Sequence, residues 1–221
     1  MNQRSTDLRR LKRFERKEAV PTTWRVLKAH FSWWDRIRLL FHSFRRAVLH
    51  DPMRKANLGS PKSEQEKLSR RQFRPVPILE DVLKFDLKCE PNKIERILGE
   101  IVAESGARFL AWNFPPVSAE EWQNKSDFQR MELGEKALSA FFNAETEDVS
   151  TDSASFAFKV HRCRFVELAQ AIERPHLSSL FCQADSRFFQ DPTNPYELQR
   201  PEMLASGDAS CKFHILFQES R

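Results

Sequence analysis

The sequence predicts an α+β fold in which N-terminal helices are followed by a helical layer packed on a small antiparallel sheet. Apolar residues recur every three or four positions over most of the first two thirds of the chain, which is typical of amphipathic helices. Alternating apolar and polar residues, typical of strands, are confined to the last third. The 221 residues, 40% of them hydrophobic, suffice for one compact unit plus an extension.

The charge distribution divides the chain into two parts. Residues 1–75 carry 20 Lys and Arg against 7 Asp and Glu, whereas the remaining 146 residues carry 16 against 24. Such an asymmetry indicates a basic arm on an acidic body, each with its own partners. We therefore expect a basic helical N-terminal extension over residues 1–76 and an α+β domain over residues 77–221.

The extension contains one long amphipathic pattern. After Pro21, Thr22 or Thr23 can cap a helix over about residues 23–50. Loop-forming residues follow over 51–61, and a short polar helix is expected over 63–71. The apolar stripe of the long helix consists of Leu27, Phe31, Trp34, Ile37, Phe41, Phe44 and Val48, with arginines largely outside it.

Three roles are open for the long helix. The first is packing of residues 24–49 on the protein's own body or within a homodimer. The second is binding to an anionic membrane surface, because a basic face opposite a Trp and Phe face is the interfacial pattern. The third, nucleic-acid binding, is the least favoured because the sequence shows no known reading motif.

In the body, three helices and one early strand are expected. A helical repeat from Ile94 to Val102 follows Pro91, and Gly106 is a suitable C-terminal stop. The apolar segment 108–114 reads as a short strand that ends at Pro115-Pro116. Further helices are expected after the capping-box pattern Ser126-x-x-Gln129 and from Pro175 to Phe188.

Three later segments alternate in hydrophobicity and predict strands. They are residues 156–160, 196–200 and 211–217. Gly207-Asp208 lies between the last two and is typical of a hairpin connection. The sheet is therefore expected to be antiparallel.

Localisation signals favour the cytoplasm. No window approaches eighteen apolar residues, which excludes a membrane-spanning helix, and the basic N-terminus lacks the apolar core of a secretory signal. The four Cys form no C-x-x-C pair, as in proteins of a reducing compartment. We expect a cytoplasmic protein, with peripheral attachment to a membrane as an open alternative.

Side chains with chemical potential are concentrated in the last sixty residues. Cys211 shares strand parity with three apolar residues, so core packing is favoured for it. Asp185 follows Cys182 at i+3 on the same helix, where a carboxylate raises the pKa of a thiol. Cys163 lies between two arginines, Arg162 and Arg164, whose charge favours the reactive thiolate if they face it.

Arg200 is the most informative single residue. On a regular strand it shares a face with Tyr196 and Leu198, and a buried guanidinium needs an acceptor. An ion pair with Asp185 is favoured over the carboxylate of a ligand, which stays the second interpretation.

A metal site would use His161, Cys163, Cys211 and His214. Their spacing matches no standard zinc finger, and no metal or cofactor is expected.

Four segments together resemble the L-2-amino-thiazoline-4-carboxylic acid hydrolase family. They are a strand ending in an Arg-Cys pair, a Cys-x-x-Asp on a helix, an Arg at the next segment, and a closing Gly-x-x-x-Cys-x-Phe. This closing motif is also similar to the ending of 4-vinyl-reductase-type domains. The resemblance covers about residues 95–218 and departs from the family at Lys212 and at Pro201-Glu202. The matching segments are Phe156–Phe165, Leu180–Asp185, Leu198–Arg200 and Ser206–Phe213.

The resemblance implies a ring-opening hydrolysis of a small cyclic C=N carboxylate. The family's namesake reaction adds water to an amidine-like thiazoline carboxylate and gives a carbamoyl-cysteine. Cys163 or Cys182 would attack the C=N carbon or hold the activated water, and Asp185 would transfer protons. Arg200 would bind the substrate carboxylate, with His161 as a second candidate for substrate binding.

A different class of function remains open. The same residues would also serve a non-catalytic small-ligand-binding or adaptor domain, whose basic amphipathic helix binds a membrane surface or a partner. We expect at least three of the four residues Cys163, Cys182, Asp185 and Arg200 to converge on one cavity, which favours the enzyme. Side chains scattered over separate faces would exclude it.

Overall fold

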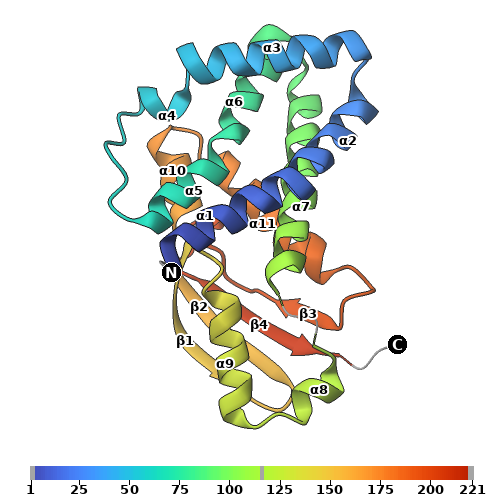
Figure 1. Cartoon of the computed structure of the whole chain (residues 1–221), viewed down its shortest axis with the longest axis vertical. Helices are drawn as coiled ribbons and strands as arrows, with labels where there is room; N and C mark the ends of the chain where they lie inside the picture. The colour runs from blue at the N-terminus through green and yellow to red at the C-terminus, as the bar shows by residue number, and fades with distance from the viewer. Residues whose placement is uncertain (1–2, 115–116, 219–221) are drawn as a thin grey trace.

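The computed structural model describes the backbone of residues 3–114 and 117–218 and confirms the α+β class (Figure 1). Helices make up one end of the molecule, and an antiparallel sheet with strand order β1-β2-β4-β3 makes up the other. The N-terminal half contains α1 (Gln3–Phe14), η1 (Glu15–Ala19), α2 (Val20–His30), α3 (Trp33–Leu49), α4 (Pro52–Lys55), α5 (Glu64–Phe73), α6 (Pro75–Asp81), η2 (Val82–Asp86) and α7 (Pro91–Asn113). The remainder contains α8 (Ala119–Gln123), α9 (Asp127–Leu138), β1 (Ala144–Thr151), β2 (Ser155–Cys163), α10 (Arg164–Ala171), α11 (His176–Phe189), β3 (Tyr196–Gln199), η3 (Leu204–Ser206) and β4 (Cys211–Phe217).

The prediction of a single helix over residues 23–50 is wrong. α2 ends at His30, Phe31 is extended, and α3 starts behind Ser32, whose hydroxyl accepts a hydrogen bond from the N–H of Asp35. The free N–H groups of a first helical turn need such an acceptor, so Ser32 favours a new start over continuation. A hydroxyl residue followed three positions later by an acidic one is a recognisable start signal.

The predicted strand over residues 108–114 is also wrong, because α7 continues through Gly106. A Cβ atom on Gly106 would lie 2.3 Å from the Cβ of Ala184, so the glycine lets α7 and α11 approach closely. It is an interior contact and not a helix stop. Pro115-Pro116, predicted to end that strand, lie outside the described residues.

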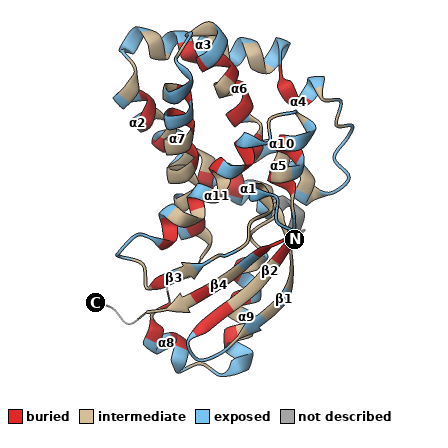
Figure 2. Cartoon of the chain, turned by 180° about the vertical axis from the view of Figure 1, so that it is seen from behind, coloured by how far each residue is buried: buried red, intermediate tan, exposed pale blue. Residues whose placement is uncertain are grey.

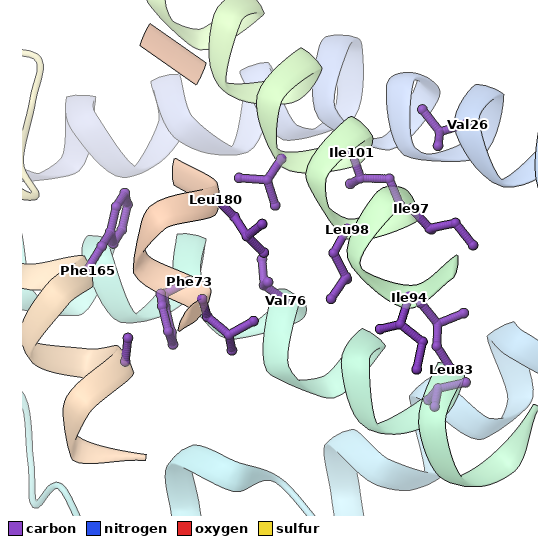
Figure 3. Close-up of a cluster of buried hydrophobic side chains, with 14 of the residues drawn as sticks. Val26, Phe73, Val76, Leu83, Ile94, Ile97, Leu98, Ile101, Phe165 and Leu180 are labelled. Atoms are coloured by element: carbon purple, nitrogen blue, oxygen red, sulfur yellow. The ribbon is translucent and has the colours of Figure 1, made fainter. Parts of the chain in front are cut away.

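Most of the helices pack around one core, which we call the helical core. It takes buried side chains from α2, α3, α5, α6, η2, α7, α10 and α11 (Figure 3). Phe73 is fully buried in it and stacks on Phe181 at 5.5 Å between ring centroids. Its members shown in Figure 3 include Val26, Phe73, Val76, Leu83, Ile94, Ile97, Leu98, Ile101, Phe165 and Leu180.

A second core, the sheet core, lies between one face of the sheet and α8, α9 and the ends of α7 and α11. Trp122 of α8 stacks on Phe217 of β4, with ring centroids 4.0 Å apart, and Phe156 of β2 is fully buried beside it. Alternation predicted β2 and β4 because every second residue faces this core. The buried members are Leu110, Val117, Trp122, Phe156, Phe188, Phe189, Tyr196 and Ile215.

The other face of the sheet carries polar side chains, and Figure 2 shows it turned toward the viewer. β1 is one of the two edge strands of the sheet. It was not predicted, because Glu145, Thr146 and Glu147 lack apolar alternation. Register shifts interrupt its pairing with β2, which further weakens the pattern.

Candidate functional site

Five residues come together where α11 meets the ends of the strands, and we call them the thiol–carboxylate cluster. Two of them lie on α11, and the other three come from three different segments. Their thiols and charges lie close enough to alter one another's pKa. The members are Cys163 at the end of β2, Cys182 and Asp185 on α11, Arg200 directly after β3, and Cys211 at the start of β4.

A β-bulge brings Cys163 into the cluster. Thr146 of β1 pairs with Val160, but Glu145 pairs with Arg162, so the partner strand has one residue too many at His161. An extra residue inverts the alternation beyond it. Cys163 therefore returns to the buried side of β2, whereas regular alternation would place it opposite Val160.

Arg200 and Asp185 form the ion pair that the strand parity of Arg200 predicted. Nη1 of Arg200 donates to Oδ2 of Asp185, and only 8% of the Arg200 side chain is exposed. Nη2 donates to the carbonyl oxygen of Cys182 at 3.1 Å, and the guanidinium lies 5.3 Å from the ring centroid of Phe213. The pair is thus fixed by α11 on one side and β4 on the other.

Burial sets the protonation of Asp185. Loss of water around the carboxyl raises its pKa from 3.8 to about 6, although Arg200 lowers it by charge and by hydrogen bonding. A carboxyl with a pKa near 6 can both accept and release a proton near neutral pH. That property is the usual requirement for a general acid or base.

The three thiols of the cluster are protonated at rest. Burial, followed by the negative charge of Asp185, raises the pKa of Cys182 to about 12, and Arg200 only partly opposes them. Burial also raises the pKa of Cys211. Cys163 shows the same direction because burial outweighs the lowering by the N–H groups of Val166 and Phe165.

The arginines beside Cys163 do not activate it. Arg162 and Arg164 both bind Glu145, and Arg162 binds Glu167 as well. Their charge is neutralised on β1 and α10, so the thiolate that two facing arginines would favour is not formed. Cys163 therefore belongs to the thiol–carboxylate cluster, whereas Arg162 and Arg164 belong to an ion-pair network outside it.

His161 lies apart from the cluster. It is exposed on the polar face of β2, where its ring nitrogens lie 3.6 Å from Glu145 and 3.5 Å from Glu147. The structure thus brings together four of the five candidate site residues and leaves His161 outside.

Sequence reasoning missed two contributors to the cluster. The side chain of Asn143 lowers the pKa of Cys163, and the ring of Phe213 lies against Arg200. Asn143 precedes the strand that was not predicted, so no pattern pointed to it. Phe213 could have been found, since it lies two residues after Cys211 on β4 and therefore shares its face of the strand.

Hollow regions lie elsewhere in the described part of the chain. A cavity of about 910 Å³ is bounded by α1, α5 and α7, with Phe14, Leu68 and Trp112 among its lining residues. A small one lies inside the sheet core beside Trp122. Neither is lined by a residue of the thiol–carboxylate cluster, so the predicted residues meet one another but do not line either of these cavities. Within residues 3–114 and 117–218, no group of three His, Cys, Asp or Glu side chains is placed to hold a metal ion.

Comparison with known proteins gives one family. The family model described as L-2-amino-thiazoline-4-carboxylic acid hydrolase matches residues 83–215, a range that contains every member of the cluster. No curated protein and no solved structure matches the chain. The similarity of the last segment to 4-vinyl-reductase-type domains stays a prediction.

Proposed function

Because the chain belongs to the L-2-amino-thiazoline-4-carboxylic acid hydrolase family, we propose that it opens a small cyclic amidine carboxylate by adding water to its C=N carbon. The observation that carries the proposal is the thiol–carboxylate cluster. A guanidinium, a carboxyl with a pKa of about 6 and three thiols from separate segments lie together inside the matched range. Such a set supplies an anion-binding group, a proton carrier and a nucleophile.

Arg200 is the group that binds the substrate carboxylate in this proposal. Its planar fork of donors suits two carboxylate oxygens at once. At rest it donates to Asp185 and to the carbonyl of Cys182. An incoming carboxylate would therefore compete with Asp185 for the guanidinium.

That competition prepares Asp185 for proton transfer. Arg200 is the group that lowers the pKa of Asp185 against the effect of burial. When a substrate takes part of this charge, the pKa of Asp185 rises above about 6, and the carboxylate becomes a stronger base. Substrate binding would thus make Asp185 a better acceptor for the proton that the reaction must remove.

Cys182 is the nucleophile that we favour, because Asp185 lies one helical turn away on α11. As Sγ forms a bond to the amidine carbon, the thiol proton passes to Asp185. The bond from that carbon to the ring heteroatom then breaks, and the heteroatom takes the proton. Water next attacks the same carbon, its proton returns through Asp185, and Cys182 leaves as a thiol.

The test is turnover of L-2-amino-thiazoline-4-carboxylate by the full chain, followed by chromatography of the carbamoyl product. We expect Cys182→Ser to lower kcat by about 1000-fold or more, with little change in melting temperature. Cys89→Ser is the matched control, because Cys89 lies between η2 and α7, outside the cluster. Full activity of Cys182→Ser would contradict the role of Cys182, and its failure to fold would show the thiol to be structural.

The same experiment decides against catalysis if the wild-type chain binds the substrate without turnover. Calorimetric binding that is lost in Arg200→Leu, with no product formed, would identify a ligand-binding domain. Absence of both binding and turnover would exclude this substrate class.

A further inference from the structure

Helix α3 exposes its apolar face and buries part of its polar face. A helix on the surface of a globular protein normally turns its apolar stripe toward the core. Here Trp34 is 73%, Phe41 63% and Phe44 73% exposed, and α3 lies across the end of the molecule that is remote from the sheet (Figures 1 and 2). We call the exposed set the α3 apolar face; it consists of Trp33, Trp34, Ile37, Leu40, Phe41, Phe44 and Val48.

Ion pairs hold α3 in this orientation. Asp86 of η2, whose side chain is 7% exposed, accepts hydrogen bonds from Arg46 and from Nη2 of Arg45, the latter at 2.8 Å. Nδ1 of His42 lies 3.3 Å from the same carboxylate. Burial tends to raise the pKa of Asp86, but Arg46, His42 and Arg45 lower it overall, so the carboxylate stays ionised. The orientation is therefore held by these three contacts together with Leu39 of α3, which is buried in the helical core, and rotation of α3 would break them all.

Basic side chains border the α3 apolar face. Arg38 of α3 has a side chain that is 58% exposed, and Lys84 is exposed on η2, the element that packs against α3. The guanidinium of Arg36 lies 5.3 Å from the ring of Trp33. An apolar centre rimmed by cations is typical of helices that lie in the interface of an anionic membrane.

The two ends of the molecule carry opposite charge. Residues 20–60, which include α3, contain eight Lys and Arg and two Asp. Residues 117–155, which include α8, α9 and β1 at the opposite end, contain three Lys and Arg and nine Asp and Glu (Figure 1). An anionic surface attracts the first end and repels the second, so the charge itself orients the α3 apolar face toward such a surface.

We propose that the α3 apolar face is a docking surface for an anionic lipid bilayer, into whose interface it inserts while α3 lies parallel to the membrane plane. A second copy of the chain is the other candidate occupant. A two-fold dimer through this face would oppose the two basic rims, which is unfavourable, whereas lipid headgroups neutralise them. None of the described helices is long and apolar enough to cross a membrane.

The test is co-flotation of the full chain with vesicles of phosphatidylcholine alone and with 30% phosphatidylserine. We expect binding to the anionic vesicles that weakens at high salt. A variant with Trp34→Ser, Phe41→Ser and Phe44→Ser should lower the partition coefficient by at least about 100-fold while keeping its circular dichroism. Phe128→Ser is the matched control, because Phe128 is 78% exposed on α9 at the acidic end.

Further measurements separate lipid from protein as the occupant. Vesicles with brominated acyl chains should quench the fluorescence of the wild type, because Trp33 and Trp34 enter the bilayer. Arg38→Gln with Lys84→Gln should weaken binding only to anionic vesicles. Wild-type protein that stays in the dense fraction with anionic vesicles would overturn the proposal. A dimer that the triple variant converts to a monomer, without lipid binding, would assign the face to a second copy instead.

Discussion

Replacement of Asp185 by Asn tests the electrostatics of the cluster directly. The carboxyl has its pKa raised from 3.8 to about 6 in the folded protein, and its side chain is only 21% exposed. A shift of roughly 2 pH units corresponds to about 3 kcal/mol of folding free energy. Asn keeps an acceptor for Arg200 but carries no proton to lose, so this contribution is absent from the variant.

The sign follows from where the proton resides. Between pH 4 and 6 the carboxyl of Asp185 is protonated in the folded state and ionised in the unfolded state, so the folded state binds more protons. The free energy of unfolding contributed by this group is therefore highest below pH 4, falls as the pH rises to 6, and is level above it. Relative to wild type, Asp185→Asn should gain about 3 kcal/mol between pH 4 and pH 7.

The assay is urea unfolding at several pH values, followed by tryptophan fluorescence, to which the buried Trp122 contributes. Asp7→Asn, which removes one exposed carboxylate on α1, is the control for the loss of a negative charge. A stability difference between Asp185→Asn and wild type that is the same at pH 4 and pH 7 would refute the reasoning. It would mean that the pKa of Asp185 is not raised on folding, either because the carboxyl is solvated or because Arg200 fully offsets the effect of burial.

Four further perturbations test the packing and the thiols. Arg200→Leu should lower the free energy of unfolding at pH 7 by about 3 kcal/mol, because it leaves a buried carboxylate unpaired. The loss should be smaller at pH 5, where Asp185 is protonated. Denaturant titrations at the two pH values measure this difference. Gly106→Ala should cost about 1–3 kcal/mol in thermal unfolding, because its Cβ would meet that of Ala184, whereas Gly99→Ala meets only the flexible Gln183 side chain at 3.2 Å and should cost far less. Phe73→Ala should cost about 3–5 kcal/mol by the same measurement, since the ring is fully buried in the helical core. Alkylation of Cys182 at pH 8, followed by mass spectrometry, should be roughly 1000-fold slower than that of an unfolded cysteine, because its pKa is about 12; rapid labelling would show that the site opens.

The sequence predicted those parts of the fold that depend on regular alternation. β2 and β4 were identified because Phe156, Phe158, Phe213 and Ile215 point to one face. The same parity argument placed Arg200 beside Asp185, since a buried guanidinium on a known face needs an acceptor nearby. Local pattern and tertiary requirement coincide at these residues.

Other parts depend on contacts that no local pattern records. Gly106 looks like a helix stop until α11 is known to pack against it. Cys163 reaches the cluster only through the bulge at His161, which is a property of the pairing with β1 and not of β2 alone. The neutralisation of Arg162 and Arg164 depends on Glu145, on the strand that the charged sequence concealed.

Helix α7 has a consequence for how the molecule comes apart. Its first half supplies Ile97 and Leu98 to the helical core, and its second half supplies Leu110 to the sheet core and Phe109 to a third cluster around α1. Figure 1 shows it running from the helical end toward the sheet. If α7 unfolds, both cores lose side chains that pack in them. The unfolding of the helical core and the unfolding of the sheet core are therefore coupled through α7. Amide hydrogens at the two ends of α7 should therefore exchange through one common opening, and a chain cleaved at its midpoint should regain structure only when both fragments are present.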